Sequence, residues 1–310
     1  MFIPKDKYLW DFWIIEHRGI YHLFYLQAPK DLPDPEQRHG VATVGHAISE
    51  DLKFWEEVGT ALELGPPGTW DDRAIWTGSV IEHKGTFYTL YTGTSKAEEG
   101  KIERIGLAIS TDLIHWEKHP ANPVLEADPR WYEVTPSTSP FNEVAWRDPY
   151  VLKERGQFCA FITARRKIGN RRWRGCIGLA KSTDLTSWQI YPPIKVFAKF
   201  AQMEVPQVIT HRGRVFLLFS ARAEWAQSQN LQVTGTFYSV ADTVLGPFSK
   251  TSPLLANSGG TFYGGKIIQD PFGRWVMLAW IGYKECKFIG ALSDPLPVEI
   301  NSDMICVADG

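Results

Sequence analysis

The sequence has few cysteines, no long apolar run and no strong charge bias, and each absence excludes a class of protein. Its 310 residues include four cysteines, Cys159, Cys176, Cys286 and Cys306, without zinc-site spacing or a dense disulfide framework. We therefore expect buried free thiols and no metal or other cofactor. No apolar run approaches the roughly 20 residues of a membrane span. A net charge of −2 gives no indication of nucleic acid or a membrane as partner.

The N-terminal segment and the composition set two further limits. MFIPKDKYLWDF lacks the apolar stretch of a signal peptide, so we expect a cytoplasmic protein. An apolar content of 44%, with 13 Trp and 17 Phe, allows a sizeable core. The sequence does not indicate an oligomeric state.

A repeated two-strand element is the main feature that is present. Each copy is an apolar run, a turn containing glycine and a second run rich in aromatic residues. The copies recur about every 60 residues. They are FWIIEHRGIYHLFYLQ from Phe12, GSVIEHKGTFYTLYTG from Gly78, PYVLKERGQFCAFITA from Pro149, PQVITHRGRVFLLFSA from Pro206 and GKIIQDPFGRWVMLAWIG from Gly265.

A second element follows the first in each copy. GHAISEDLKFW at Gly45, GLAISTDLIHW at Gly106 and GLAKSTDLTSW at Gly178 are near copies, and divergent versions begin at Thr236 and Phe288. The shared S-x-D-L-x-x-W pattern predicts a structural turn and then a tryptophan that packs between neighbouring units. The residues concerned are Asp51, Asp112 and Asp184, and Trp55, Trp116 and Trp188.

These units predict the fold. Five repeats of about four short strands each are typical of an all-β five-bladed β-propeller, in which every blade is a four-stranded antiparallel sheet. No segment has sustained helical periodicity. We expect residues 1–310 to form a single catalytic domain, because linked blades close into one unit.

Three acidic residues open apolar runs at near-matching places in the repeat. They are Asp11 in LWDFWII, Asp148 in WRDPYVL and Glu204 in MEVPQVI. A carboxylate at the mouth of a buried strand is costly unless it is paired or used. One such acid commonly caps a turn, but three favour a common site. With Pro149 superposed on Pro206, Glu204 lies one residue earlier than Asp148.

Propeller geometry predicts which loops lie around these acids. In a four-stranded antiparallel blade, the second hairpin is on the same face as the start of the innermost strand. Loops on a rigid scaffold commonly carry recognition. The segments expected around the acids are 29–39, 95–104, 165–174 and 223–231.

Several motifs resemble the five-bladed propeller glycosidases and transferases that include invertases, levansucrases and arabinanases. HLFYLQAP at His22, VGHAISEDLKFW at Val44 and IWTGSVIEHKGTFYTLYTG at Ile75 are similar to invertase segments, and WRDPYVL carries the Arg-Asp-Pro triplet. TFYGGKIIQDPFGRWVMLAWIG resembles the last blade, while LWDFW is closer to the levansucrase Trp-Asp-x-Trp. The likeness spans nearly the whole chain and is strongest to glycoside hydrolase families 32 and 68, which act on β-fructofuranosides.

The resemblance implies roles for the three acids. Asp11 matches the nucleophile, Asp148 the transition-state stabiliser and Glu204 the acid/base of a retaining double displacement. Met203 and Val205 suggest an apolar setting that raises the pKa of Glu204. The implied substrate is a small carbohydrate such as sucrose or a fructan. Alternatives are an inverting arabinanase- or xylosidase-like enzyme, fructosyl transfer, and a non-catalytic sugar-binding propeller.

Further residues are candidates for substrate binding. Aromatic faces pack on sugar C–H groups, whereas hydroxyl, amide and guanidinium groups bind sugar hydroxyls. Core packing and strand-to-strand bonding are the competing roles, with nearly even odds for Trp13. The candidates are Trp10, Trp13, Gln27, Trp76, Thr77, Ser79, Arg147 and Tyr263.

The chain also departs from the family pattern. The acid/base segment reads Glu-Val-Pro where invertases usually have Glu-Cys-Pro, and we expect no C-terminal β-sandwich after the fifth blade. RRKIGNRRWR, residues 165–174, has no counterpart. A solvated charged hairpin is one interpretation; the other is that Arg171 or Arg172 contacts an anionic substrate group.

Overall fold

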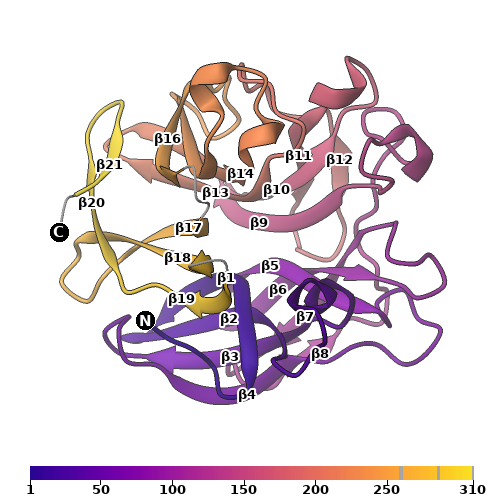
Figure 1. The fold of residues 1–310 in the computed structure, drawn as a ribbon, viewed down its shortest axis with the longest axis vertical. Coiled ribbons are helices and arrows are strands. Elements are labelled where there is room, and N and C mark those ends of the chain that lie inside the picture. Colours follow the sequence, from indigo (N-terminus) through magenta and orange to yellow (C-terminus); the bar gives the residue numbers. More distant parts are fainter. Residues whose placement is uncertain (258–260, 285–286, 309–310) are drawn as a thin grey trace.

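Five antiparallel sheets surround one axis in the computed structural model, which describes residues 1–257, 261–284 and 287–308 (Figure 1). The innermost strand of each sheet contacts the innermost strands of the two neighbouring sheets, and the fifth contacts the first. This confirms the predicted five-bladed propeller.

The first three blades follow the expected strand order. In each blade, consecutive strands of the chain are neighbours in the sheet. Blade one contains β1 (Lys7–His17), β2 (Ile20–Pro29), β3 (Thr43–Ser49) and β4 (Glu56–Leu62). Blade two contains β5 (Ala74–His83), β6 (Thr86–Thr94), β7 (Arg104–Ser110) and β8 (Glu117–Lys118). Blade three contains β9 (Trp146–Glu154), β10 (Gln157–Arg165), β11 (Gly175–Ser182) and β12 (Gln189–Tyr191).

Blade four follows the same order, and blade five differs in one detail. Blade four contains β13 (Glu204–His211), β14 (Arg214–Ala221), β15 (Thr234–Ala241) and β16 (Ser249–Asn257). Blade five contains β17 (Phe262–Gln269), β18 (Trp275–Lys284), β19 (Lys287–Leu292), β20 (Leu296–Ile300) and β21 (Ile305–Val307). Both β19 and β20 pair with β18, so the third strand position is divided between them.

The N-terminal residues join the last blade. The backbone of Phe2 exchanges two hydrogen bonds with Leu292 on β19, of 3.0 and 2.9 Å. Figure 1 shows the last strands beside β1, where the two ends of the ring meet. The first and last parts of the chain therefore close the propeller together.

The turn glycines have the conformation that the repeat predicts. Gly19 and Gly85 have φ of 82° and 79°, and the residues before them, Arg18 and Lys84, both have φ of 55°. Two successive residues with positive φ form the tight hairpin turn whose twist matches that of paired strands. A local rule therefore fixes the register of the first hairpin in these blades.

The S-x-D-L-x-x-W element is a structural turn, as predicted. In the first copy the Asp51 carboxylate accepts from the backbone N–H groups of Lys53 and Phe54, both at 2.9 Å, and the Ser49 hydroxyl accepts from Leu52 N–H at 2.9 Å. In the second copy, Trp116 packs edge-on against Phe24 of the neighbouring blade, with ring centroids 5.5 Å apart. These tryptophans thus join adjacent blades.

Buried apolar clusters lie between neighbouring blades, where one sheet face packs on the next. Cys159 and Cys176 are buried free thiols, Cys306 is only partly buried, and Cys286 lies outside the described residues. The expectation of buried thiols is therefore wrong for Cys306, which lies on the terminal strand β21.

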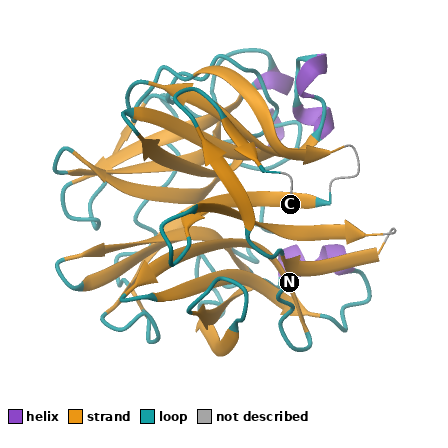
Figure 2. Cartoon of the chain, turned by 90° about the vertical axis from the view of Figure 1, so that its left-hand side faces the viewer, coloured by secondary structure: helices purple, strands orange, loops and turns teal. Residues whose placement is uncertain are grey.

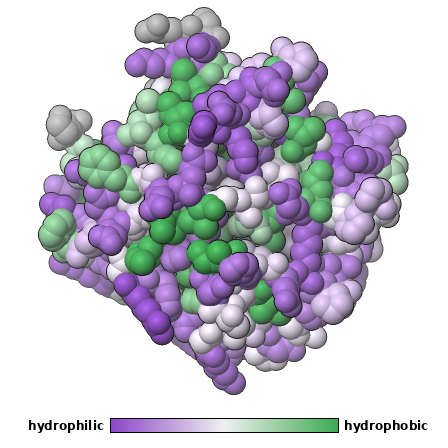
Figure 3. All heavy atoms as spheres, turned by 90° about the horizontal axis from the view of Figure 1, so that it is seen from below, coloured by the Kyte–Doolittle hydropathy of each residue, from purple (hydrophilic) through white to green (hydrophobic). Residues whose placement is uncertain are grey.

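Short helices lie at one end of the inner strands, and tight hairpins lie at the other. Figure 2 shows the short helices gathered at one end, opposite the tight hairpins. They are η1 (Pro35–Gly40), η2 (Pro136–Thr138), η3 (Arg171–Trp173), η4 (Ala223–Trp225) and η5 (Gln229–Leu231). The face in Figure 3 has hydrophobic patches separated by hydrophilic residues. Within the described ranges, no helix is long and apolar enough to cross a membrane.

Candidate active site

The three predicted acids line one cavity of about 700 Å³ at the helical end of the propeller. Asp11 comes from β1, Asp148 from β9 and Glu204 from β13. The structure therefore brings together residues from blades one, three and four. Such a cavity holds a small sugar.

Every inner strand carries a β-bulge near this cavity. A bulge places two residues opposite one on the partner strand and so re-aims the side chains around it. Residues at the bulges without a register partner are Trp10 and Asp11, Thr77, Asp148 and Pro149, Val205 and Pro206, and Gly264 and Gly265.

The acids occupy three successive positions relative to these bulges. Glu204 immediately precedes its bulge, Asp148 is the first bulge residue and Asp11 is the second. The offset of Glu204 from Asp148 confirms the proline alignment, while the further offset of Asp11 was not predicted. Asp148 has φ of 55°, a conformation that aspartate tolerates better than most residues.

Asp11 is held by a tryptophan from the last blade. Trp280 Nε1 donates to Asp11 Oδ1 at 2.8 Å. Burial, followed by the charges of Asp148 and Glu204, raises the pKa of Asp11 to about 7. Gly264 permits the contact, because a Cβ there would lie 2.9 Å from Asp11 Oδ1 and 2.8 Å from Trp280 Cδ1.

Asp148 has one engaged carboxylate oxygen. Its Oδ2 accepts from Thr163 Oγ1 at 2.9 Å and from the Val205 N–H at 3.1 Å. Oδ1 has no hydrogen-bond partner within the described part of the chain, and the side chain lines the cavity. One oxygen is therefore fixed while the other can accept from a sugar hydroxyl.

Glu204 is held by two donors. Arg147 Nη2 donates to Oε1 at 2.6 Å, and the Tyr263 hydroxyl donates to Oε2 at 2.6 Å. The expected apolar setting is wrong, because these polar groups surround the carboxylate although Met203 and Val205 are buried. Burial, and then the charge of Glu204, raises the pKa of Tyr263, so the phenol stays protonated and can donate.

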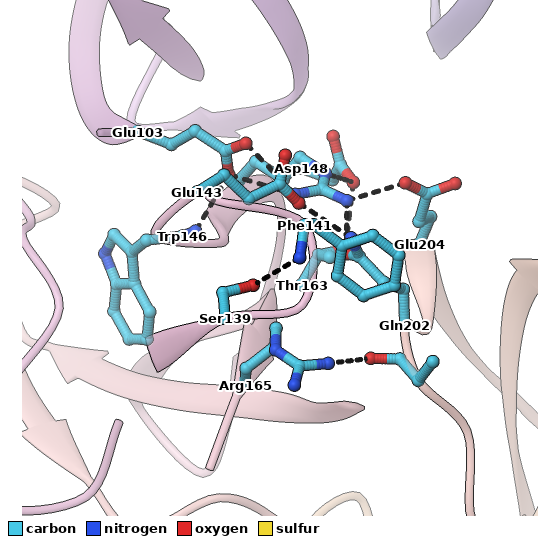
Figure 4. Close-up of polar contacts among 12 residues, drawn as sticks. Glu103, Ser139, Phe141, Glu143, Trp146, Asp148, Thr163, Arg165, Gln202 and Glu204 are labelled. Atoms are coloured by element: carbon cyan, nitrogen blue, oxygen red, sulfur yellow. Dashed lines mark hydrogen bonds and ion pairs between the residues drawn. The ribbon is translucent and has the colours of Figure 1, made fainter. Parts of the chain in front are cut away.

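Arg147 connects the acids to a buried network. Glu103, Glu143, Gln202 and Glu204 converge on one point in Figure 4, and Arg147 donates to all four. Its Nη1 lies 3.0 and 3.1 Å from the two oxygens of Glu103. Such fixed geometry lets Arg147 position Glu204 and balance its charge.

A buried lysine lies near the acids, on the inner strand of blade five. Lys266 Nζ donates to the backbone carbonyls of Val205 and Pro206 at 2.7 and 3.0 Å, which ties it to the bulge after Glu204. Burial lowers the pKa of Lys266 to about 8, and the charges of Asp148 and Asp11 oppose that shift.

Five of the eight expected binding residues line the cavity: Trp10, Trp76, Thr77, Arg147 and Tyr263. Trp76 Nε1 donates to the His39 carbonyl at 2.9 Å. Trp10 is 1% exposed, so it supports the cavity wall more than it offers a face to a ligand.

The structure does not bring the other three to the cavity. Trp13 and Ser79 lie at the opposite end of the inner strands, where Trp13 stacks on Phe24 and Ser79 Oγ accepts from the Val151 N–H at 3.0 Å. The Gln27 amide donates to hydroxyls of its own blade. An inner strand rises about 3.3 Å per residue, so a residue two positions beyond the site is already some distance along the axis.

The expected loops contribute unequally. Residues 29–39 and 223–231 supply Arg38, His39 and Glu224 to the cavity wall, whereas 95–104 supplies Glu103 behind Arg147. In the basic hairpin, Arg165 and Arg174 pair with buried Glu133. Arg171 donates to backbone carbonyls of residues 137–139. Residues 165–174 are absent from the lining of the catalytic cavity.

Several residues of the site were not expected from the sequence. Trp280 contacts Asp11, Glu103 and Gln202 contact Arg147, and Lys266 contacts the backbone carbonyls of the bulge after Glu204. Gln202 precedes Glu204 by two positions in the same segment, which was an available signal. The others come from strands and loops that resemble ordinary core or turn sequence.

Comparisons with known proteins agree with this geometry. The model of the glycosyl hydrolases family 32 N-terminal domain matches residues 4–290. A sucrose-6-phosphate hydrolase of Zymomonas mobilis is 27% identical over 283 residues, which cover 86% of this chain and 51% of the relative. The chain spans about half the length of the curated relatives that it matches along most of its length.

Solved structures show the same fold. An inulosucrase from Halalkalicoccus jeotgali bound to kestose gives a TM-score of 0.77 at 20% identity, covering 99% of this chain and 90% of that one. A β-fructofuranosidase of Bombyx mori gives 0.70 at 20% identity, covering 98% and 65%. Because the family model spans nearly the whole chain, the chain belongs to glycosyl hydrolase family 32.

Proposed function

We propose that this protein hydrolyses β-fructofuranosides such as sucrose or fructans by a retaining double displacement. The observation that carries the proposal is the meeting of Asp11, Asp148 and Glu204 in one sugar-sized cavity. Family 32 membership and relatives named sucrose-6-phosphate hydrolase support the same substrate class.

In the first step, an Asp11 oxygen attacks the anomeric carbon of the fructosyl unit. The bond from that carbon to the leaving oxygen breaks, and Glu204 gives its proton to that oxygen. Water then attacks the anomeric carbon, transfers a proton to Glu204 and releases Asp11. A sugar hydroxyl in place of water gives fructosyl transfer.

The surrounding groups supply the charge balance that these steps need. Burial raises the pKa of Asp11 to about 7 and also raises the pKa of Asp148. The mechanism requires an ionised Asp11 and a proton on Glu204 for the leaving oxygen. The free oxygen of Asp148 accepts a hydrogen bond from a fructosyl hydroxyl, and this hydrogen bond strengthens as positive charge develops on the ring.

The test is incubation with sucrose, a fructan and arabinan, with the first product followed by NMR. A retained anomeric configuration supports the proposal, whereas inversion favours the arabinanase-like alternative. The Asp11→Asn variant should lose turnover, while Asp184→Asn, in a structural turn, should keep it. Unchanged turnover by Asp11→Asn would refute Asp11 as the nucleophile, and no turnover by the unmodified protein would leave only a sugar-binding role.

A phosphorylated sugar is a second candidate substrate. Arg222 is exposed, lines the cavity and has no acidic partner in the described ranges; its guanidinium lies 5.2 Å from the centre of the Trp225 ring. A guanidinium in this position suits a phosphate on the leaving sugar. Arg222→Ala should raise KM for sucrose-6-phosphate more than KM for sucrose.

The cytoplasmic location stays a prediction.

A further inference from the structure

A second hollow of about 700 Å³ adjoins the catalytic cavity. Phe141, Glu224 and Trp225 line both, so these three side chains form a shared wall. The remaining lining comes from Pro140, Ala201 and residues 170–172 of the basic hairpin. We call this second hollow the hairpin groove.

Basic residues of the hairpin make the groove rigid. Arg165 is fully buried, pairs with Glu133 at 2.7 Å and lies 5.3 Å from the centre of the Phe141 ring. Phe141 and Glu204, both labelled in Figure 4, line the catalytic cavity. Arg171 bonds to the carbonyls of Ser137, Thr138 and Ser139. The hairpin is thereby fixed to the segment that carries Phe141.

The groove also contains polar groups that the described part of the protein does not engage. The Arg172 guanidinium contacts the ring of Trp173 but makes no hydrogen bond or ion pair. Asn170 uses its Oδ1 to accept from Arg172 N–H, which leaves its amide donors free. Glu224 has no hydrogen-bond or ion-pair partner among the described residues. Planar polar groups beside aromatic rings match the hydroxyls and C–H faces of a sugar.

We propose that the hairpin groove is a subsite for a sugar unit of an oligosaccharide, beyond the two units that flank the cleaved bond. This inference rests on the proposed function, because the groove is continuous with that cavity through Phe141, Glu224 and Trp225. Arg172 and Asn170 donate to hydroxyls of the distal unit, and Trp225 packs against its ring. The hairpin recognises neutral sugar here, and three of its six basic residues are already committed: Arg165 and Arg174 to Glu133, and Arg171 to backbone carbonyls.

The experiment measures affinity against chain length in the Asp11→Asn background, where ligands persist. Sucrose, the trisaccharide kestose and its fructosyl-extended tetrasaccharide are titrated by calorimetry. Affinity should rise by roughly five- to tenfold once a unit reaches the groove, the size of one or two net hydrogen bonds. Arg172→Ala should remove this increase and leave the affinity for sucrose unchanged.

Lys167→Ala is the matched control, because it removes one positive charge from the same hairpin outside both hollows. It should retain the increase with chain length. Equal affinity for all three sugars would overturn the proposal, as would an equal loss for sucrose and tetrasaccharide in Arg172→Ala. An Arg172 effect confined to sucrose-6-phosphate would instead identify an anion site and overturn it too.

The two proposals fail in distinguishable ways. If unmodified protein turns over no fructoside while Asp11→Asn binds longer sugars more tightly, the proposed activity fails and the groove stands. If sucrose is cleaved but affinity is independent of chain length, the groove fails and the activity stands.

Discussion

Replacing Trp280 with Phe should move the acid limb of the pH–activity profile upward by about one unit. Burial and the charges of Asp148 and Glu204 raise the pKa of Asp11 to about 7, and the hydrogen bond from Trp280 opposes that rise. Phe keeps most of the ring and removes the donor. The nucleophile must be ionised, so activity at a given acidic pH should fall as its pKa rises.

The magnitude follows from the 2.8 Å bond between Trp280 Nε1 and Asp11 Oδ1. A hydrogen bond to a charged group contributes about 1.5–3 kcal/mol, and one pKa unit corresponds to about 1.4 kcal/mol. The full bond would therefore shift the pKa by about one to two units. Water in the cavity can replace part of it, which leaves about one unit.

The assay is kcat/KM for sucrose between about pH 5 and pH 10, because this ratio reports the ionisation of the free enzyme. Trp76→Phe is the matched control: Trp76 also lines the cavity, but its N–H bonds to the His39 carbonyl. The control should leave the limb in place. An unmoved limb in Trp280→Phe, or an equal shift in both variants, would refute the assignment of this pKa to Asp11.

Three further predictions concern the same cluster. Asp11→Asn should raise the free energy of unfolding by about 1–2 kcal/mol at about pH 8. The pKa of Asp11 rises to about 7 on folding, so ionisation of this carboxyl destabilises the folded protein as the pH increases from about 4 to 7. Urea unfolding should therefore show a gain at about pH 8 and none near pH 4. Gly264→Ala should reduce kcat about a hundredfold by displacing Asp11 and Trp280, whereas Gly273→Ala, with no atom within 4 Å of its Cβ, should affect stability alone. Lys266→Met should lower stability by about 2 kcal/mol, because two backbone carbonyls lose their donor. It should also move the acid limb of the pH–activity profile upward, because the charge of Lys266 lowers the pKa of Asp11. Urea unfolding measures the first effect, and the same pH series measures the second.

The fold was predictable because its main signals are local. Gly19 with Arg18 determines a tight turn without reference to the rest of the chain. Asp51 and Ser49 each accept from a backbone N–H three residues further along the chain. Repetition of such local elements indicates a propeller before any long-range contact is known.

The acids were predictable as individuals, but their partners were not. Each acid stands out because it opens an apolar strand. Trp280 lies 269 residues from Asp11 in the chain, and only closure of the ring brings them together. Glu103 contacts Arg147 from the loop before β7, and nothing in its own segment distinguishes it from a turn residue. Gln202 had one signal, its place two residues before Glu204.

The bulges account for both the successes and the errors at the site. A bulge is defined by how two strands pair, so a single strand sequence does not reveal it. Glu204, Asp148 and Asp11 come from three successive bulge positions, which gives each a different approach to the cavity. Identical positions in every blade would instead present carboxyls with one common orientation toward the axis. The proposed nucleophile, stabiliser and acid need different orientations around the substrate, and three successive bulge positions on one repeated kind of strand would supply them.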